Sequence, residues 1–186
     1  MEECAITKTM QHLGFVIHKH HATSLHYDLR LEIEGVMPSW SIPKGPTLDN
    51  TVKRLAMPTS NHAMDYRHFE GVIPESSYGA GPVMVWDEGY YIPEIEIAKG
   101  VRQEIPDRNE GEQVMEKGLK KGELKFVLHG KKLHGSFALV KTKGWGPKDS
   151  WLLIKHNDKF VQTGYDANDY DFSAISKKSI DEIAKE

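Results

Sequence analysis

The clearest pattern along the chain is a strict alternation of apolar and polar residues over positions 25–33, which read LHYDLRLEI. Successive side chains of a β-strand point to opposite faces, so this alternation predicts a strand with one face in a core and the other outside it. Residues 15–20 alternate in the same way and predict a second strand. Residues 21–24 are expected to form the turn between the two strands.

The rest of the chain shows short strand patterns separated by glycine and proline. Further strands are expected at 40–42, 83–86, 124–128, 136–141 and 151–155. Loops are expected at 38–48 (around the short strand 40–42), 71–81 and 100–111. Short helices are expected at 112–121 and 179–184. Many short strands with few helices indicate a mainly β domain, a barrel or a sandwich, and we expect a single-domain β-barrel with a few short helices.

The length of 186 residues suits one domain better than two. We expect a loose N-terminal leader over residues 1–13, the barrel over residues 14–164, and a polar C-terminal tail over residues 165–186 that is partly helical. No internal repeat and no low-complexity tract interrupts this arrangement.

Composition limits the classes of function that remain. The chain has 24 Lys and Arg against 27 Asp and Glu, a formal net charge of −3, which argues against a protein that coats nucleic acid through charge alone. An enzyme that engages nucleic acid locally is still compatible with this balance. A single cysteine, Cys4, excludes an intramolecular disulfide and suits a reducing compartment. Without a signal-peptide pattern or an apolar run of about 20 residues, a cytoplasmic protein with no membrane partner is expected.

Three side chains have the spacing of a metal site. The alternation places His26 and Asp28 on one face of a strand, and His20 lies across the turn on the neighbouring strand. Two imidazoles and a carboxylate can hold one side of a divalent ion and leave positions open for water and substrate. Donors of this kind, without a thiolate, favour Mn, Zn, Fe or Co over Cu(I). The alternative is that these are solvated polar residues on an exposed strand.

The opposite face of the same strand is apolar, so any site built on the polar face lies in an outer groove of the barrel. Arg30 continues that polar face, and its planar guanidinium can grip two phosphate oxygens. The alternative for Arg30 is a salt bridge with Asp28 or Glu32. Lys44 stands in the rigid sequence PKGP, which would hold a cation in place. His62 by itself is more typical of a surface histidine than of a catalyst.

Six sequence blocks occur in order between about residue 14 and about residue 160. They are KH followed after five residues by HYDLRLE, then WSIPKGP, KRLA, FEGVIPE, YGAGPV and WD. This ordered set resembles the 3′-phosphoesterase domain of bacterial DNA ligase D. The resemblance implies a β-barrel with its site in an outer groove. It also implies an enzyme of break repair that removes a 3′-terminal ribonucleoside and then the remaining 3′-phosphate from nucleic-acid ends. The chain length leaves no room for a polymerase or ligase domain, so we expect a stand-alone member.

The resemblance also assigns residues. The family's metal, typically manganese, is held by residues that match His20, His26 and Asp28, with zinc and cobalt as alternatives. The family's phosphate-contacting residues match Arg30, Lys44, Arg54, His62 and Tyr66. The implied partners are nucleic-acid 3′ ends and, from family context alone, a DNA ligase, a polymerase and Ku.

Two departures from the family pattern bear on the second reaction. Ser60 stands where the family often has an acidic residue, and the leader before residue 14 is short. We therefore expect removal of the ribonucleoside to be better retained than removal of the 3′-phosphate.

The rival hypothesis is a non-catalytic barrel that binds single-stranded nucleic acid. Such modules combine a basic groove with stacked aromatic rings, and this chain has four tryptophans: Trp40, Trp86, Trp145 and Trp151. We expect most of these rings in the core, where large apolar side chains usually lie. A passive binding module has no need of the His/His/Asp set.

Overall fold

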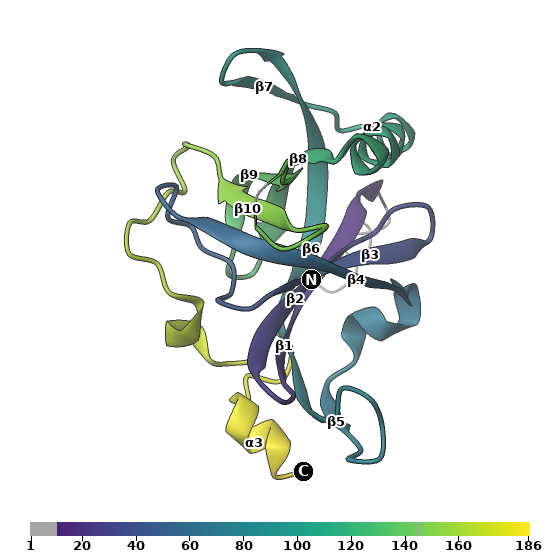
Figure 1. The fold of residues 1–186 in the computed structure, drawn as a ribbon, viewed down its shortest axis with the longest axis vertical. Coiled ribbons are helices and arrows are strands. Elements are labelled where there is room, and N and C mark those ends of the chain that lie inside the picture. The colour runs from purple at the N-terminus through teal and green to yellow at the C-terminus, as the bar shows by residue number, and fades with distance from the viewer. Residues whose placement is uncertain (1–10, 145) are drawn as a thin grey trace.

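The computed structural model describes residues 11–144 and 146–186, which form an antiparallel β-barrel with short helices at its two ends (Figure 1). Eight strands close the barrel in the order β1-β2-β3-β4-β10-β9-β8-β6, and β6 pairs back with β1. Strands β5 and β7 pair with β6 outside this ring. The structure confirms the expected mainly β barrel, and the sandwich alternative is wrong.

The barrel strands are β1 (Leu13–His21), β2 (Leu25–Leu31), β3 (Val36–Ile42), β4 (Lys53–Ala63), β6 (Gly81–Ala98), β8 (Glu123–Gly130), β9 (His134–Lys141) and β10 (Trp151–Lys155). The outlying strands are β5 (Gly71–Ile73) and β7 (Val101–Glu104). The helices are α2 (Arg108–Lys121) and α3 (Ile180–Ala184), with 3-10 turns η1 (Met64–His68) and η2 (Ala167–Tyr170).

The core fills the inside of the barrel with the apolar residues of the alternating strands. Leu29 and Leu31 of β2 are fully buried there, as the alternation predicts. Trp40, Trp86 and Trp151 also belong to this core, and the rings of Trp40 and Trp151 meet edge to face at 5.4 Å between centroids. These three tryptophans therefore stabilise the barrel and are closed to a nucleic-acid ligand. Trp145 lies outside the described residues.

Several strands are longer than the sequence pattern predicts. Strand β3 continues through Pro38, which the pattern assigned to a loop. Proline has no N–H to donate, and the β3–β4 register shifts between Met37 and Ser39, so the ladder needs no hydrogen bond from Pro38. Strand β4 was not predicted, since its second half is polar and exposed. Strand β6 runs for 18 residues where only 83–86 were expected, and β7 occupies part of the predicted loop 100–111.

Both helices are set by capping residues. Asp107 accepts a hydrogen bond from the Glu110 amide, so α2 begins four residues before the predicted start at 112, and Gly122 ends it in the left-handed conformation. Ser179 caps α3 in the same way, which confirms the helix predicted near 179–184.

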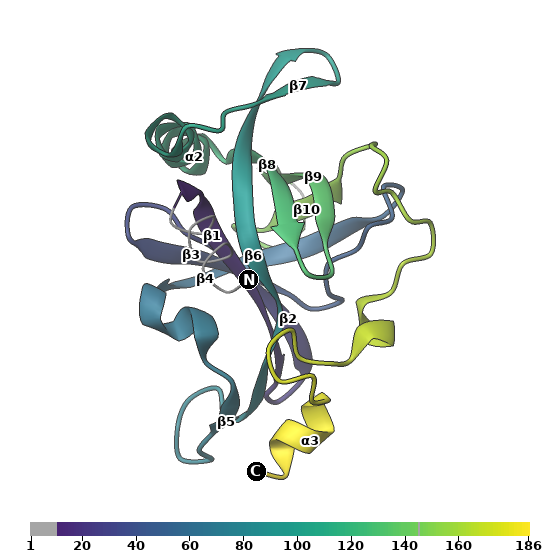
Figure 2. The same ribbon diagram turned by 180° about the vertical axis from the view of Figure 1, so that it is seen from behind.

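The segment after β10 runs along the outside of the barrel to α3, close to β5 (Figure 2). Ala174, Ile180 and Ile183 are buried in this segment, so it contributes to packing as well as carrying polar residues. Residues 1–10 of the expected leader lie outside the described residues. None of the described helices has the length and apolarity needed to cross a lipid bilayer.

Candidate metal and phosphate site

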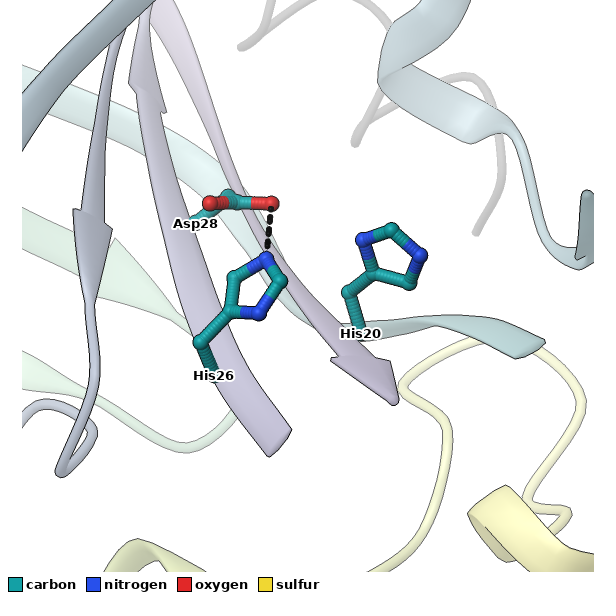
Figure 3. A group of neighbouring side chains, drawn as sticks. All are labelled: His20, His26 and Asp28. Carbon is teal, nitrogen blue, oxygen red and sulfur yellow. Dashed lines mark ion pairs between the residues drawn. The ribbon is translucent and has the colours of Figure 1, made fainter. Parts of the chain in front are cut away.

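His20, His26 and Asp28 come together on the outer wall of the barrel, as the sequence predicts (Figure 3). The register of β1 and β2 explains this: His20 lies opposite His26, and His18 lies opposite Asp28. One ligand atom from each of the three residues lies within 4.8 Å of the other two. Within the described part of the chain, this is the one cluster of His, Cys, Asp or Glu with the spacing of a metal site.

The polar face of β2 is covered, although it lies outside the barrel. Asp28 is 6% exposed and His20 is 8% exposed. A Cβ built on Gly79, in the loop between β5 and β6, would lie 3.5 Å from Cε1 of His20, so that loop packs against the imidazole. The interpretation as solvated side chains on an exposed strand is therefore wrong for His20 and Asp28, which neighbouring segments shield from water. His26 is partly exposed.

The nitrogen atoms of the two imidazoles suit a divalent cation. Nδ1 of His26 lies 3.1 Å from the Ser24 carbonyl oxygen, to which it donates. Nε2 therefore carries the lone pair in the neutral imidazole and donates to Asp28 when the imidazole is protonated. That Nε2 lies 3.3 Å from Oδ2 of Asp28. Nε2 of His20 is buried and has no hydrogen-bond partner in the described structure. A buried nitrogen without a partner beside a carboxylate fits a metal ligand, because burying it unpaired is unfavourable.

The electrostatics keep the carboxylate ionised. Burial alone raises the pKa of Asp28, but the hydrogen bond from His26 and the charge of Arg30 outweigh it and lower the pKa in sum. The hydrogen bond to Asp28 raises the pKa of His26. Burial, followed by the neighbouring His26, lowers the pKa of His20. Without metal, His26 is thus the imidazole that holds a proton most strongly, and a cation that binds there must displace it.

Arg30 connects this cluster to a second group of side chains. Its Nε donates to Nδ1 of His18 at 3.0 Å, and its Nη2 donates to Oδ2 of Asp28 at 3.3 Å. Its Nη1 lies 3.0 Å from Nδ1 of His62. The salt bridge considered as an alternative for Arg30 is therefore present with Asp28. Glu32 instead pairs with Arg108.

His62 and Tyr66 contact Arg30 and complete the second group of side chains. Nδ1 of His62 lies 3.0 Å from Nη1 of Arg30, from which it can only accept, and 3.0 Å from the Ser60 carbonyl oxygen, to which it can only donate. The neutral imidazole therefore makes one of these two hydrogen bonds at a time. Burial, and then the charge of Arg30, lower the pKa of His62, which favours this neutral form. The Tyr66 ring lies 4.8 Å from the His62 ring and 5.2 Å from the Arg30 guanidinium carbon. The sequence-predicted residues Arg30, His62 and Tyr66 thus meet beside the metal cluster.

His18 is the residue that the sequence analysis did not single out. It is completely buried, and burial together with Arg30 lowers its pKa to about 3, so it is neutral at pH 7 and accepts from Arg30. The signal for it was present, since His18 and His20 share a face of β1. We expect His18 to orient Arg30.

Lys44 and Arg54 lie at one rim of the barrel. Lys44 follows Ile42, which pairs with Tyr27, so it lies at the end of the barrel where β2 begins. Arg54, near the start of β4, lines with Lys44 a depression of about 540 Å³ that also includes Asp49. These two cations are at the same end of the barrel as the metal cluster, and they lie beyond the hydrogen bonds that Arg30 makes to His18, Asp28 and His62.

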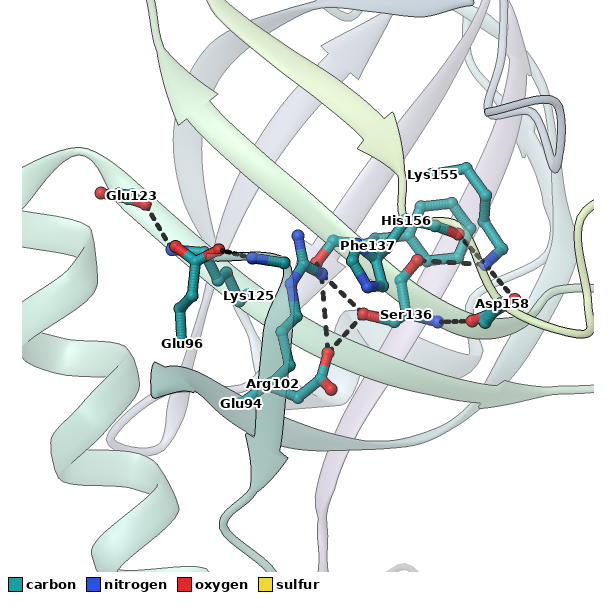
Figure 4. A network of polar contacts seen from close by, with 11 residues as sticks. Glu94, Glu96, Arg102, Glu123, Lys125, Ser136, Phe137, Lys155, His156 and Asp158 are labelled. Atoms are coloured by element: carbon teal, nitrogen blue, oxygen red, sulfur yellow. Dashed lines mark hydrogen bonds and ion pairs between the residues drawn. The ribbon is translucent and has the colours of Figure 1, made fainter. Parts of the chain in front are cut away.

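A second polar network joins β6, β7, β9 and the segment that follows β10, and it is structural (Figure 4). Arg102 of β7 donates to the Ser136 hydroxyl at 2.6 Å and pairs with Glu94 of β6 at 3.7 Å. Lys155 donates to Asp158 at 2.7 Å. Because the charged groups are paired with one another, the network anchors the projecting β6–β7 hairpin to β9 and β10.

The fold and the site together define a closed antiparallel barrel that carries, on its outer wall, donors for a divalent cation next to donors for a phosphate. The chain belongs to the DNA ligase D 3′-phosphoesterase domain family, whose sequence profile matches residues 18–141. This confirms the family resemblance carried by the sequence blocks.

Relatives of known name support the same assignment. The chain is 43% identical to the multifunctional non-homologous end joining protein LigD of Pseudomonas aeruginosa over 146 residues, which is 78% of this chain and 15% of the relative. It is 38% identical over 154 residues to the protein of the same name from Mycolicibacterium smegmatis, 83% of this chain and 18% of the relative. The chain thus spans less than a fifth of the length of these relatives. Membership of the family indicates a phosphoesterase and does not favour the passive binding module.

Proposed function

We propose that this protein is a divalent-metal-dependent phosphodiesterase that removes a 3′-terminal ribonucleoside from nucleic-acid ends during break repair. The observation that carries the proposal is the contact of Arg30 with both halves of the site, Asp28 on one side and His62 on the other. A guanidinium that contacts both a proposed metal ligand and a side chain that hydrogen-bonds the phosphate is placed to bind the phosphate between them.

The metal half of the site consists of His20, His26 and Asp28. Its nitrogen and oxygen donors suit a divalent ion such as Mn²⁺, Zn²⁺ or Co²⁺, and the family resemblance favours Mn²⁺. When bound, such an ion supplies Lewis acidity toward a phosphate oxygen and lowers the pKa of a bound water.

The phosphate half consists of Arg30, His62 and Tyr66. The guanidinium of Arg30 neutralises the charge that builds on the non-bridging oxygens, and its burial strengthens the interaction because little water screens it. In the tautomer in which Nδ1 accepts from Arg30, Nε2–H of His62 donates a hydrogen bond to the phosphate or gives its proton to the departing 5′ oxygen of the ribonucleoside. The Tyr66 hydroxyl stays protonated, since burial raises its pKa, and serves as a further donor.

The rim cations Lys44 and Arg54 extend the site along the strand. We propose that they bind backbone phosphates of the substrate strand as it crosses the barrel end near His26. The substrate is thus the 3′ end of a primer-template, and the proteins acting on the same end are a DNA ligase, a polymerase and Ku.

A second reaction, removal of the remaining 3′-phosphate, is proposed as the weaker activity. Ser60 is exposed and offers only its backbone carbonyl to His62, at 3.0 Å from Nδ1. An acidic side chain at that position would raise the proton affinity of His62, whose pKa burial lowers here. The 3′-phosphate product should therefore accumulate.

The test is a 5′-labelled primer-template with one 3′-terminal ribonucleotide, incubated with and without chelator beside an all-deoxy control. Cleavage that needs added Mn²⁺, prefers the ribonucleotide and yields a 3′-phosphate supports the proposal. Full activity in chelator, equal cleavage of both substrates, or attack at the 5′ end would contradict it.

A further inference from the structure

Tyr78 is an aromatic side chain beside the metal cluster that the proposed mechanism does not use. It is the most exposed of the large hydrophobic residues in the described structure, with a relative exposure of 106%. It belongs to the YGAGPV block, in the turn between β5 and β6. An isolated exposed tyrosine is ordinary on a protein surface, so its position has to carry the argument.

The turn that presents Tyr78 is held against the end of β1. Gly79 packs beside His20, with a built Cβ 3.5 Å from Cε1 of that imidazole. Gly81, at φ +129°, lies so close to β1 that a Cβ would fall 2.2 Å from the carbonyl oxygen of His21. A side chain at position 81 would push the turn away from the metal cluster. These contacts fix the backbone that follows Tyr78, and Gly79, the residue directly after it, packs against a proposed metal ligand.

The other rings of the site already have partners. Tyr66 stacks on Phe69 with 5.1 Å between ring centroids and also contacts His62. The His20 and His26 rings face each other at 5.0 Å. Tyr78 is instead exposed, so the faces of its ring are open to solvent.

The substrate supplies a matching group. A 3′-terminal nucleoside is joined directly to the phosphate that is cleaved, so its base extends one nucleoside beyond the metal cluster. Every nucleobase has a flat π face, and stacking on an aromatic side chain tolerates any base. An end-processing site that accepts any terminal base needs this kind of contact.

We propose that Tyr78 is the stacking platform for the nucleobase of the 3′-terminal nucleoside. The inference rests on the proposed diesterase function and names the part of the substrate that the site grips beyond the phosphate. It makes a distinction between the two reactions: a 3′-phosphate end has no nucleoside beyond the phosphate, and Tyr78 has nothing to stack on there.

The kinetic test compares Tyr78→Ala with Tyr78→Phe on three primer ends: a terminal ribonucleotide, a terminal abasic ribose and a 3′-phosphate. Removal of one stacked base contact lowers kcat/KM on the order of tenfold. We expect that loss for Tyr78→Ala on the ribonucleotide end only, with wild-type rates on the other two ends and for Tyr78→Phe throughout. An equal loss on the abasic end, or no loss on the ribonucleotide end, overturns the inference.

A binding test separates this inference from the proposed function. A primer-template ending in 2-aminopurine ribonucleotide is titrated with protein in chelator, so that binding is measured without cleavage. Quenching of the 2-aminopurine fluorescence reports stacking of the terminal base. We expect quenching by the wild type and by Tyr78→Phe but not by Tyr78→Ala. Phe160→Ala, which removes a partly exposed ring elsewhere, is the matched control and should quench as the wild type does.

The two tests fail in different ways. A wild type that quenches but does not cleave in Mn²⁺ contradicts the proposed function and leaves the stacking site standing. A wild type that cleaves but shows the same fluorescence as Tyr78→Ala removes the stacking site and leaves the function standing.

Discussion

Nη2 of Arg30 lies 3.3 Å from Oδ2 of Asp28, two residues earlier on the same strand and on the same face of β2. One carboxylate therefore faces both the proposed cation and the guanidinium that would hold the phosphate. This relationship makes metal binding and phosphate binding dependent on each other, because the charge of Asp28 serves both. Substitutions in the metal half and substitutions in the phosphate half can nevertheless probe the two functions separately.

Arg30→Lys should lower kcat by about two orders of magnitude, the usual effect of losing one donor aimed at developing charge. An ammonium keeps the charge but cannot reach His18, Asp28 and His62 at once as the guanidinium does. Steady-state cleavage of the ribonucleotide-ended primer measures the effect. Arg108→Lys, on the ion pair with Glu32, is the control and should keep kcat within about a factor of two of wild type. An Arg30→Lys enzyme as fast as wild type would reduce Arg30 to a salt-bridge partner.

Mn²⁺ should raise the thermal midpoint of the wild type and not that of His20→Ala. Saturation at 100 times Kd stabilises by about 2.7 kcal/mol, or roughly 5–10 °C for a chain of this size. His62→Ala is the informative comparison, because His62 belongs to the phosphate half and should retain the full Mn²⁺ shift while losing activity. Calorimetry with and without Mn²⁺ gives the answer. If His20→Ala keeps the shift, the ion binds elsewhere.

Acidification should destabilise the metal-free protein partly through His18. Its pKa falls from 6.5 to about 3 on folding, so between these values the unfolded state binds a proton that the folded state does not. The contribution of His18 to the free energy of unfolding is therefore complete above pH 6.5 and is lost as the pH falls. The loss amounts to about 3 kcal/mol between pH 6.5 and pH 4. Urea unfolding in chelator at pH 7 and pH 4 measures this.

The comparison for this prediction is His18→Asn, which keeps an acceptor for Arg30 and cannot take the proton. Its loss of stability between pH 7 and pH 4 should be smaller than that of wild type by most of that amount. His21→Asn, at the exposed end of β1, should follow the wild type. Identical pH dependence in wild type and His18→Asn would mean that His18 is not held neutral.

Lys44→Ala and Arg54→Ala should weaken substrate binding without a large change in kcat. If each cation binds one backbone phosphate, its removal raises KM several-fold and lowers the slope of log affinity against log salt by about 1. Lys120→Ala on α2 removes an exposed cation distant in the fold and should leave both quantities unchanged. A drop in kcat with an unchanged salt slope would instead assign these residues to the cleaved phosphate.

The strands that could be predicted are those whose alternation the barrel imposes. Residues 25–33 have an apolar side chain at every second position, because one face of β2 meets the core, and the metal cluster follows from that parity. Strand β4 lacks this signal, since Thr59 and Ser60 are exposed in its second half. It exists because β3 and β10 pair with it on either side, and pairing between distant segments is not visible in a local pattern.

The burial of the site could not be predicted for a similar reason. Alternation indicates that Asp28 and Arg30 point away from the barrel core, but not that Tyr66 and the Gly79 turn, from later in the chain, close over them. His18 was overlooked on the same ground. Its role depends on a contact with Arg30 from the next strand. Residue type and spacing thus indicated the metal donors, and tertiary packing decided which neighbours work with them.

Strand β2 also anchors the fold at its far end. Beyond Asp28 and Arg30, the carboxylate of Glu32 accepts from the Gly14 amide and pairs with Arg108 at the start of α2. Asp28, Arg30 and Glu32 therefore stand two residues apart along β2 and the residue that follows it, interleaved with core residues. A deletion of one residue within this strand would turn every polar group inward and every apolar group outward. We conclude that this stretch can evolve by substitution but not by insertion or deletion, and that length changes among relatives should be confined to the turns on either side of it.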